Sequence, residues 1–477
     1  MSVSDEKIRS IVKKVLEDSL RQPSAADTAA DTASGSDPGW GVFQNMDDAI
    51  EAARVAFERF QSFDLQDRRK FTDAVRRVAL DHKEEYSRMA VELTKMGRAP
   101  HKILKHINVA KNSPGIEYLR PDAWAGKNGL AVDEWSPWGV IGNISPSTHP
   151  SPTMLDNIII QLSAGNTIAF NPHPVAKQLN ARVIQHCNQA MTRAGAPENL
   201  VTCVAHPTLE SAEFMFAHPQ TKLLSITGGP AVVKAAMKHS KPIIAAGPGN
   251  PPVLVDESAD LELAAREISE SAAFDNNILC TAEKEVFIVD SVFDRFVQAF
   301  STLGNIKLTG SQMDQLADKA LVKGEQEYYI SRDFVGRNAS VLGRALGMQV
   351  SDEVGLLFGE TDADHPWVQA EQMTPCLPLV RVRDFEQGLE ACIQAEHGFE
   401  HTASIFTRDM NRATRYSKRI KTDIVVINGR TSRGDGGDLG EGYFSHTIAS
   451  PTGHGIVTPR DFCRKRRIMT VGAMRFI

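Results

Sequence analysis

The sequence predicts an α/β protein with two doubly wound parallel sheets and a small additional β element. Short apolar or β-branched runs alternate with helical segments, which is typical of a parallel sheet that helices cover on both faces. This alternation occurs before Cys280 and again after it, so we expect two such domains. The chain ends in an apolar, β-like run behind a basic cluster, and a terminal strand of this kind must pair with another strand.

Composition limits the classes of function. Of the 477 residues, 42% are hydrophobic and 23% are charged, which is typical of a globular protein. The net charge of −6 provides no basic field for nucleic acid or an anionic membrane, and no run is long and apolar enough to span a bilayer. The cysteines lack the spacing of a zinc site or a disulfide framework, so we expect cytosolic thiols and no metal. They are Cys187, Cys203, Cys280, Cys376, Cys392 and Cys463.

The N-terminal segment predicts a tethered amphipathic helix. Residues 1–20 carry apolar side chains at helical spacing and lack the apolar core of a secretory signal. Residues 21–39 are rich in small residues, which favours a flexible linker. Such a helix can pack on its own domain, but a tethered one better fits a groove on a partner protein. Membrane binding fits less well, because the polar face carries acids and the apolar face has no aromatic anchor.

The body begins with helices and continues with strands. Apolar residues at three- and four-residue spacing from Met46 to Asn112 predict two to four helices. We expect the run near Ala125–Trp135 and the C-terminal tail to build an intersubunit sheet. The strand candidates of the first domain are VIGNIS, NTIAFNP, LVTCVA, KLLSIT and PPVLVD, and those of the second are EVFIVD, PLVRVRD, HTASIFT and DIVVINGR.

Two segments carry signs of chemistry. The run SITGGPAVVKAAMK predicts a strand, a turn and a helix whose N-terminus offers N–H groups to a phosphate, although Gly228 and Gly229 can equally be ordinary turn residues. No GxGxxG fingerprint occurs. A lone cysteine is more often a small buried hydrophobe. Cys280 differs because its neighbours in FDNNILCTAEK are polar and helix-forming, which favours a helix that crosses a cleft.

From about Asp47 onward the chain resembles the aldehyde dehydrogenase superfamily, and within it the acylating propionaldehyde and acetaldehyde dehydrogenases of bacterial microcompartments. The resemblance implies an NAD-binding domain at 40–121 and 137–245, a catalytic domain at 246–460, and oligomerisation strands at 122–136 and 461–477. Seven motifs in the family's order carry it: PWGVIGNISPSTHP, LSAGNTIAFNPHP, SITGGP, AAGPGNPPVLVD, FDNNILCTAEK, EQMTPCLPLVRV and SPTGHGIVTPRDF.

The resemblance implies that Cys280 attacks the aldehyde, that hydride passes to NAD, and that a thioester remains. Asn171 stands where hydrolytic members have a lysine on the adenosine ribose, and its neutrality favours NAD over NADP. Glu371 matches the glutamate that holds the nicotinamide ribose. The residues expected to bind the cofactor are Ser145, Pro146, Asn171, His173, Thr227, Gly228, Gly229 and Glu371.

Two further departures from the hydrolytic branch favour coenzyme A as acyl acceptor. Ala245 occupies the place of the general-base glutamate, so water is poorly activated, whereas a thiol needs less help. Thr148 occupies the place of the oxyanion-hole asparagine, and its hydroxyl can donate to the oxyanion or only shape the loop.

We therefore expect oxidation of propionaldehyde, or a similar short aliphatic aldehyde, with NAD and CoA to acyl-CoA and NADH. CoA is expected to enter the nucleotide cleft after NADH leaves. The N-terminal helix resembles an encapsulation peptide, which implies a microcompartment in the cytoplasm, and the terminal strand implies a homodimer or homotetramer. The alternatives are hydrolytic oxidation to a free acid, a catalytically silent core protein of the microcompartment, and a cysteine esterase that needs no nicotinamide.

Overall fold

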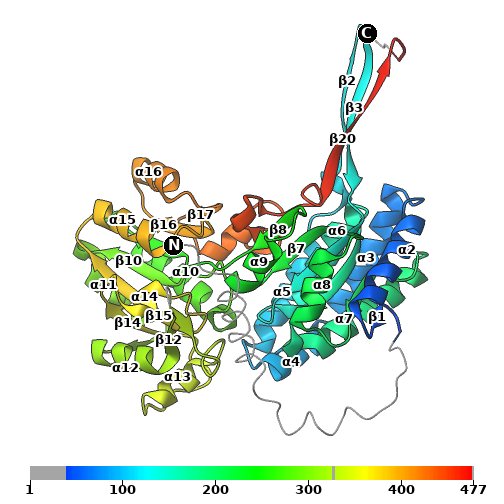
Figure 1. Cartoon of the computed structure of the whole chain (residues 1–477). Coiled ribbons are helices and arrows are strands. Elements are labelled where there is room, and N and C mark those ends of the chain that lie inside the picture. The colour runs from blue at the N-terminus through cyan, green and yellow to red at the C-terminus, as the bar shows by residue number, and fades with distance from the viewer. Residues whose placement is uncertain (1–38, 325–327, 475–477) are drawn as a thin grey trace, which may run out of the picture.

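The computed structural model describes residues 39–324 and 328–474. The predicted helix of residues 1–20 and nearly all of the predicted linker lie outside the described residues. The described chain forms two α/β bodies side by side, and a long β arm projects from one of them (Figure 1).

The first body is built on a six-stranded parallel sheet with the order β1-β6-β5-β4-β7-β8. Apolar residues of α2, α8 and α9 form one buried cluster with the sheet, and those of α3, α6 and α7 form another, so helices cover both faces. Every residue of α6 is buried. The strands are β1 (Val42–Phe43), β4 (Val140–Ser145), β5 (Thr167–Pro172), β6 (Val201–Val204), β7 (Thr221–Thr227) and β8 (Ile243–Ala246). The helices are α2 (Met46–Phe60), α3 (Leu65–Asp81), α4 (Lys83–Thr94), α5 (Ala99–Asn112), α6 (Pro150–Ser163), α7 (Lys177–Arg193), α8 (Leu209–Ala217) and α9 (Pro230–Ala236).

The second body is built on a seven-stranded parallel sheet with the order β11-β14-β15-β10-β9-β16-β17. Its strands are β9 (Pro252–Val255), β10 (Glu285–Val289), β11 (Ile306–Leu308), β14 (Leu357–Thr361), β15 (Cys376–Val382), β16 (Thr402–Phe406) and β17 (Ile424–Ile427). Its helices are α10 (Leu261–Ala273), α11 (Asp290–Ser301), α12 (Gly310–Ala320), α13 (Ala339–Ala345), α14 (Pro366–Gln369), α15 (Phe385–Ala395) and α16 (Met410–Ile420). Two small antiparallel pairs complete the chain: β12 (Leu321–Lys323) with β13 (Tyr328–Ile330), and β18 (Ile448–Ala449) with β19 (Gly455–Ile456).

The predicted fold class is confirmed. Four of the apolar runs before Cys280 form β4, β5, β6 and β7 of the first sheet, whereas PPVLVD, expected in the first domain, forms β9 of the second sheet; the runs after Cys280 form β10, β15, β16 and β17. The helical stretch from Met46 to Asn112 forms four helices, α2 to α5. The sequence reading missed β1, β8, β11 and β14, which have two to five residues each, because runs this short cannot be assigned by periodicity alone.

The arm is an antiparallel sheet of β2 (Asp122–Gly126), β3 (Gly129–Pro137) and β20 (Cys463–Val471), with β3 in the middle. The basic run ahead of the terminal strand pairs with acids of β3: Arg467 binds Asp133 through two nitrogens at 2.6 and 2.9 Å. Trp124, Met469 and Val471 are exposed on this sheet. A thin sheet with apolar side chains in solvent and two unpaired edges is a candidate contact between subunits.

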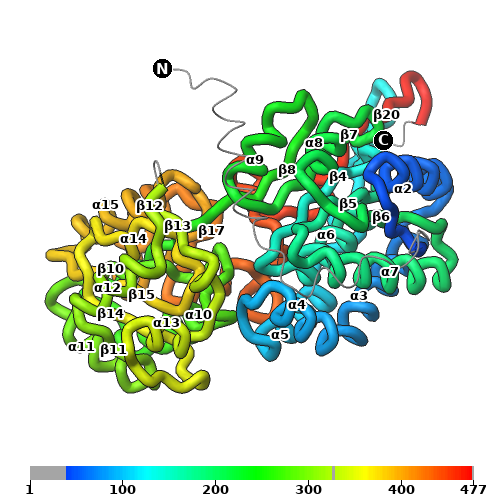
Figure 2. The backbone as a smooth tube through the Cα atoms, turned by 60° about the horizontal axis from the view of Figure 1, so that its bottom comes forward, coloured from blue at the N-terminus to red at the C-terminus, as the bar shows by residue number. Residues whose placement is uncertain are grey.

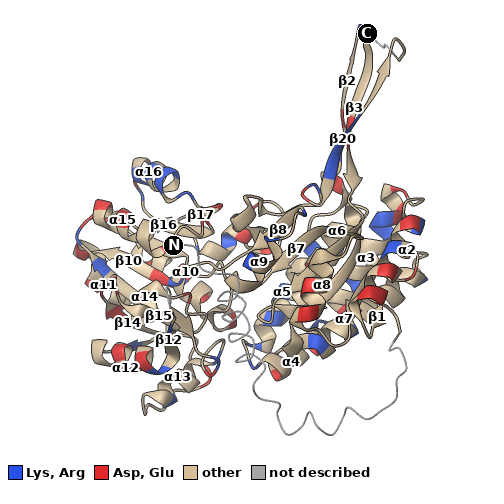
Figure 3. Ribbon diagram, viewed as in Figure 1, with Lys and Arg blue, Asp and Glu red and all other residues tan. Residues whose placement is uncertain are grey.

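Charge is mixed over the surface. In the view of Figure 3, basic and acidic residues are interspersed over the helices of both bodies, in line with the small net charge. Among the described residues, none of the helices has both the length and the apolar character that crossing a membrane requires.

Candidate active site

The order of the first sheet defines a crevice for a ligand. The chain runs outward from β4 to β5 and β6, and then returns to the other side of β4 to form β7 and β8. Open parallel sheets bind ligands outside the carboxyl ends of their strands at such a reversal point. The predicted cofactor residues come together at this edge: Ser145, Pro146 and Thr148 at the end of β4, Asn171 and His173 at the end of β5, and Thr227, Gly228 and Gly229 at the end of β7.

The second sheet faces this crevice with the opposite edge. Gly249, Cys280, Glu371 and His401 each precede one of the parallel strands β9, β10, β15 and β16, so they lie at one amino-terminal edge. The Gly249 amide donates to Oε1 of Glu371 at 3.3 Å. A Cβ at Gly249 would lie 2.7 Å from the Cys280 carbonyl oxygen and 3.0 Å from Cγ of His401, so the missing side chain lets these segments approach. Cys280, Glu371 and His401 are therefore neighbours.

Cys280 lies on a turn, and the predicted helix across a cleft is wrong. Helix α10 ends at Ala273, and the next residues adopt a left-handed backbone at Asp275, Asn276 and Asn277, with φ of 48°, 57° and 60°. Asp and Asn tolerate this region better than most residues. The polar run that suggested a helix face is therefore a tight turn. The other five cysteines are buried, whereas Cys280 is partly exposed.

Lys284 holds this turn closed. Its buried ammonium donates to the carbonyl oxygens of Asn277 at 2.9 Å and Leu279 at 2.8 Å, and also to the Asn277 side chain. The Asn277 amide donates in turn to the Glu283 carbonyl at 2.9 Å. Because the carbonyls before Cys280 are fixed by a buried cation, the position of the thiol is fixed as well.

A buried ion cluster joins the two bodies next to the turn. Asp275 of the second body accepts from Lys102 at 3.1 Å and from Lys105, and both lysines belong to α5 of the first body. Lys102 also donates to the Thr148 carbonyl at 3.2 Å, and Lys105 lies 2.9 Å from Nδ1 of His149. Burial would raise the pKa of Asp275, but the two lysines outweigh it and lower the pKa to about 2. Figure 2 shows α4 and α5 at the junction of the two bodies.

This cluster presents Thr148 to the site. The loop after β4 is tied to the Cys280 turn through Lys102, because its ammonium donates both to the Thr148 carbonyl and to the Asp275 carboxylate. The Thr148 side chain is partly exposed, and within the described residues its hydroxyl has no hydrogen-bond partner. A fixed backbone with a free hydroxyl is the arrangement that a donor to a developing oxyanion requires.

The Cys280 thiol needs a proton acceptor. Burial raises its pKa to about 12, Glu371 and Asp435 add to this, and Lys284 opposes it. At neutral pH the resting thiol is protonated, and only the thiolate is a strong nucleophile. Ala245, which is buried in β8 beside Ile226, provides no base, because its methyl group has no proton-accepting atom.

Sequence reasoning missed His401, which is buried beside this site. Its Nδ1 is 2.8 Å from the Thr402 hydroxyl, and its Nε2 is buried without a partner among the described residues. Burial and, to a smaller extent, Lys284 lower its pKa to about 4, so the ring is neutral at pH 7 and its unpartnered nitrogen can accept a hydrogen bond. His401 directly precedes β16, at the edge of the sheet that also carries Gly249 and Cys280. This position can be recognised only when the order of the strands is known.

The residues expected to bind the cofactor differ in whether their hydrogen-bonding atoms already have partners in the protein. Asn171 accepts from the Ser211 hydroxyl and donates to the Thr208 carbonyl at 3.3 Å, so its amide is largely occupied. Ser145 accepts from Asn180 at 3.1 Å. The Thr227 hydroxyl is buried and unpartnered within the described chain, which fits a site completed by a bound polar molecule. Gly229 is the N-cap of α9, and Pro230 at the first position of the helix offers no N–H.

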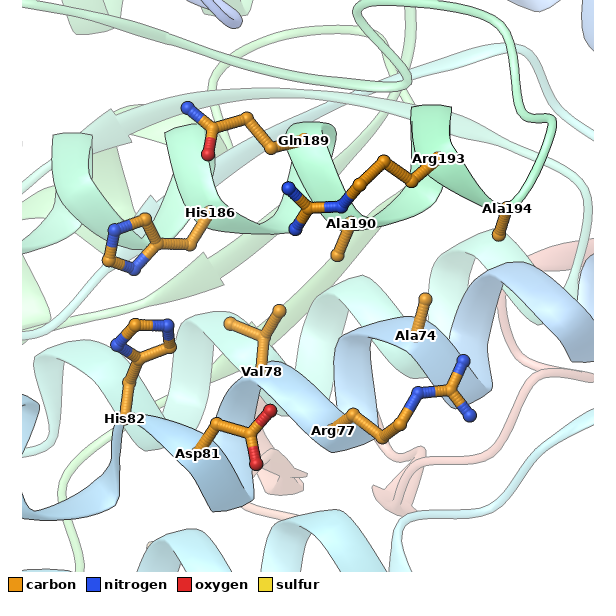
Figure 4. Close-up of a pocket in the computed structure, with 10 residues that line it drawn as sticks. All are labelled: Ala74, Arg77, Val78, Asp81, His82, His186, Gln189, Ala190, Arg193 and Ala194. Carbon is orange, nitrogen blue, oxygen red and sulfur yellow. The ribbon is translucent and has the colours of Figure 1, made fainter.

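A separate surface pocket of about 460 Å³ lies between α3 and α7 (Figure 4). His82 and His186 point toward one another across it, and with Glu85 they are the one group of described residues spaced to hold a metal ion. Several of these atoms already have partners: Nδ1 of His82 bonds Glu85 at 2.9 Å, Arg182 bonds Glu85 at 2.6 Å, and Nδ1 of His186 bonds the Tyr86 hydroxyl at 2.8 Å. This pocket shares no residue with the Cys280 site.

Known proteins resemble this chain over nearly its whole length. The model of the aldehyde dehydrogenase family matches residues 41–437. Acetaldehyde dehydrogenase (acetylating) EutE of Salmonella typhimurium is 42% identical over 441 residues, which cover 92% of this chain and 94% of that protein. The structure of Rhodopseudomonas palustris propionaldehyde dehydrogenase with bound propionyl-CoA has a TM-score of 0.89 and 39% identity, covering 94% of this chain and 100% of that one. A propionaldehyde dehydrogenase from the Clostridium phytofermentans fucose utilisation bacterial microcompartment has a TM-score of 0.89 and 38% identity, covering 92% of this chain and 100% of that one.

Proposed function

The chain belongs to the aldehyde dehydrogenase family, and we propose that it oxidises a short aldehyde such as propionaldehyde with NAD and CoA to acyl-CoA and NADH. The observation that carries this proposal is the partly exposed Cys280 on a fixed turn, opposite a crevice whose β8 strand carries Ala245 in place of a carboxylate base. A thioester in such a site is poorly attacked by water and readily attacked by a thiol.

The first half of the reaction forms the thioester. The Cys280 thiol gives its proton to the neutral His401 ring, and the sulfur attacks the carbonyl carbon of the aldehyde. The carbonyl oxygen becomes an oxyanion, and the Thr148 hydroxyl and the Cys280 amide donate to it. When NAD is bound, its nicotinamide ring accepts the hydride that leaves the aldehyde carbon. The carbonyl then re-forms as the thioester.

Residues of both edges hold the cofactor in this proposal. The loops at Ser145–Pro146 and Thr227–Gly229 flank the reversal point of the first sheet, and the unpartnered Thr227 hydroxyl supports a polar ligand there. Asn171 and His173 lie at the adenosine side, and Glu371 lies beside Cys280 at the nicotinamide side. The neutral Asn171 provides no cation for a 2′-phosphate, which favours NAD over NADP.

The second half of the reaction transfers the acyl group. A CoA thiol attacks the thioester carbon, the bond to the Cys280 sulfur breaks, and acyl-CoA leaves. His401 first releases to solvent the proton that it took from Cys280; it then accepts the proton of the CoA thiol and returns it to the departing Cys280 sulfur. We place CoA in the crevice that NADH has left, which gives ping-pong kinetics and competition between CoA and NAD. A complex that holds both molecules at one site would contradict this step.

We also propose that the arm joins two copies of the chain. Strand β17 is the edge of the second sheet, and its Ile427 side chain is 40% exposed, while β2 and β20 are the two edges of the arm. Pairing of an arm edge with the β17 edge of another copy would bury both and give a homodimer or homotetramer. Sedimentation of the protein with and without residues 463–477 tests this assembly.

We propose that residues 1–20 target the chain to a bacterial microcompartment. The support is the amphipathic pattern of that segment and the likeness to an enzyme from a fucose utilisation microcompartment. Shell or core proteins are the proposed partners. Fusion of residues 1–20 to a fluorescent protein tests this targeting. Co-purification of the fusion protein with microcompartment shells supports it, and diffuse fluorescence in the cell contradicts it.

The covalent step can be tested without CoA. Enzyme incubated with propionaldehyde and NAD is expected to accumulate a propionyl group on the peptide that carries Cys280, detected by mass spectrometry. The free acid released at a comparable rate would instead favour hydrolytic oxidation. Acyl transfer from thioesters without any nicotinamide would favour an esterase, and a complete absence of NADH formation would favour a silent core protein.

A further inference from the structure

Asp435 is a buried carboxyl beside the catalytic cysteine. Asp435 is the last residue of the short 3-10 helix Thr431–Asp435, and it is only 8% exposed. Its Oδ2 accepts from the hydroxyl of Thr281 at 3.0 Å, and Thr281 directly follows Cys280. Asp435 also lies close enough to contribute to the raised pKa of the Cys280 thiol. No motif of the sequence singled out this residue.

The second oxygen of this carboxyl has no partner. Its Oδ1 is fully buried, and none of the described residues donates a hydrogen bond to it. Leaving one carboxyl oxygen buried and unpaired costs folding free energy, so a role in stability does not explain it. The pKa of Asp435 is raised to about 7, because burial and Glu283 raise it by more than the Thr281 hydroxyl and Lys105 lower it. The group keeps at least one accepting oxygen in either protonation state.

A second buried polar atom near Lys105 is unpartnered among the described residues. The Nε2 of His446 is buried without a partner in the described part of the chain, and its ring stacks on His149 with the centroids 5.7 Å apart. Lys105, which bonds His149, also acts electrostatically on both Asp435 and His446. The surroundings of Cys280 therefore offer hydrogen-bonding capacity that an aliphatic aldehyde would leave unused.

We propose that the preferred substrate is a short aldehyde with a hydroxyl group near the carbonyl carbon, and that Asp435 accepts the hydrogen bond from that hydroxyl. This inference rests on the proposed acylating function and specifies its substrate class. A site that buries a polar group to bond a substrate hydroxyl discriminates strongly against the analogue that lacks it, because the protein group is then left unpaired. The reaction itself is unchanged, since the hydroxyl neither forms nor breaks a bond with the enzyme.

The test compares two aldehydes that differ by one hydroxyl: 2-hydroxypropanal and propanal. The ratio of their kcat/KM values, measured as NADH formation with NAD and CoA, is expected to favour 2-hydroxypropanal at least tenfold in the unchanged protein. Asp435→Leu is expected to lower this ratio at least tenfold, whereas Asp435→Asn, which keeps an accepting oxygen, lowers it less. Asp438→Leu is the matched control, because Asp438 is an exposed acid three residues away, and its ratio should match that of the unchanged protein.

Each result decides the proposal. A ratio at or below one in the unchanged protein overturns the proposal. This measurement uses no variant, so it does not depend on whether a variant folds. A ratio that Asp435→Leu leaves in place also overturns the role of Asp435. Stronger turnover of aminoacetaldehyde than of 2-hydroxypropanal would assign the carboxyl to an ammonium group and contradict the hydroxyl. Failure of the proposed function looks different, because then neither aldehyde gives CoA-dependent NADH.

Discussion

Two buried aspartates beside Cys280 differ in their partners. Asp275 is fully buried between Lys102 and Lys105, and its pKa is lowered to about 2. Asp435 is almost as buried, but it receives one hydroxyl, and its pKa is raised to about 7. The paired carboxylate joins the two bodies and fixes the loops that carry Cys280 and Thr148. The unpaired one has capacity for a ligand, and the same holds for His401, whose Nε2 is free among the described residues.

The largest effect is expected where the paired carboxylate is removed. Asp275→Ala leaves two buried ammonium groups without their counter-charge, which costs about 3–5 kcal/mol of unfolding free energy. Urea denaturation of the variant measures this loss. Asp438→Ala removes an exposed acid that meets Lys111 at 3.5 Å and should cost less than about 1 kcal/mol. Equal losses in the two variants would contradict the structural role of Asp275.

His401, like Asp435, has a buried atom without a partner among the described residues, and we expect it to act as the proton acceptor. His401→Gln is expected to lower kcat by about a hundredfold, because the proton acceptor is lost. We also expect the pH–rate profile of this variant to shift to higher pH, where the thiol ionises without a proton acceptor. This shift distinguishes a role of His401 in proton transfer from a role in packing. His397→Gln is the control, since His397 is exposed and its ring bonds the Gln369 carbonyl at 3.1 Å. An unchanged profile in His401→Gln would assign His401 a packing role.

The two carboxyls also differ in the sign of their pH dependence. The pKa of Asp435 is raised from 3.8 to about 7, so the folded state binds its proton more tightly, and stability falls as the pH rises from about 4 to 7. Asp435→Asn is therefore expected to gain about 2 kcal/mol over the unchanged protein between pH 5 and pH 8. Asp275, with its lowered pKa, stabilises above about pH 4 and loses this only as the pH falls toward 2. Parallel stability curves for variant and unchanged protein would show that Asp435 does not titrate in this window.

The smallest effect is expected at the oxyanion donor. Thr148→Val keeps the shape of the side chain and removes the hydroxyl, and it should lower kcat about tenfold with little change in KM. Thr148→Ser keeps the hydroxyl and should retain most of the activity. A loss of equal size in both variants would mean that Thr148 only shapes the loop.

The sequence predicts the fold more completely than the site. PPVLVD and EVFIVD are recognisable as strands because burial on both faces requires apolar runs, and they form β9 and β10. The Cys280 segment was wrongly expected to be helical, because Asp and Asn occur both on polar helix faces and in left-handed turns, and only the backbone distinguishes them. His401, Lys284 and Asp435 approach Cys280 through the order of the strands, which single-sequence patterns do not contain.

The central claim is that Cys280 forms a thioester that CoA releases. The most direct measurement is NADH formation from propionaldehyde, or from 2-hydroxypropanal, with NAD in the presence and absence of CoA, for the unchanged protein and for Cys280→Ala. We expect multiple turnovers only with CoA, and none in Cys280→Ala. Equal rates with and without CoA would contradict the acylating reaction, and turnover in Cys280→Ala would contradict the thioester.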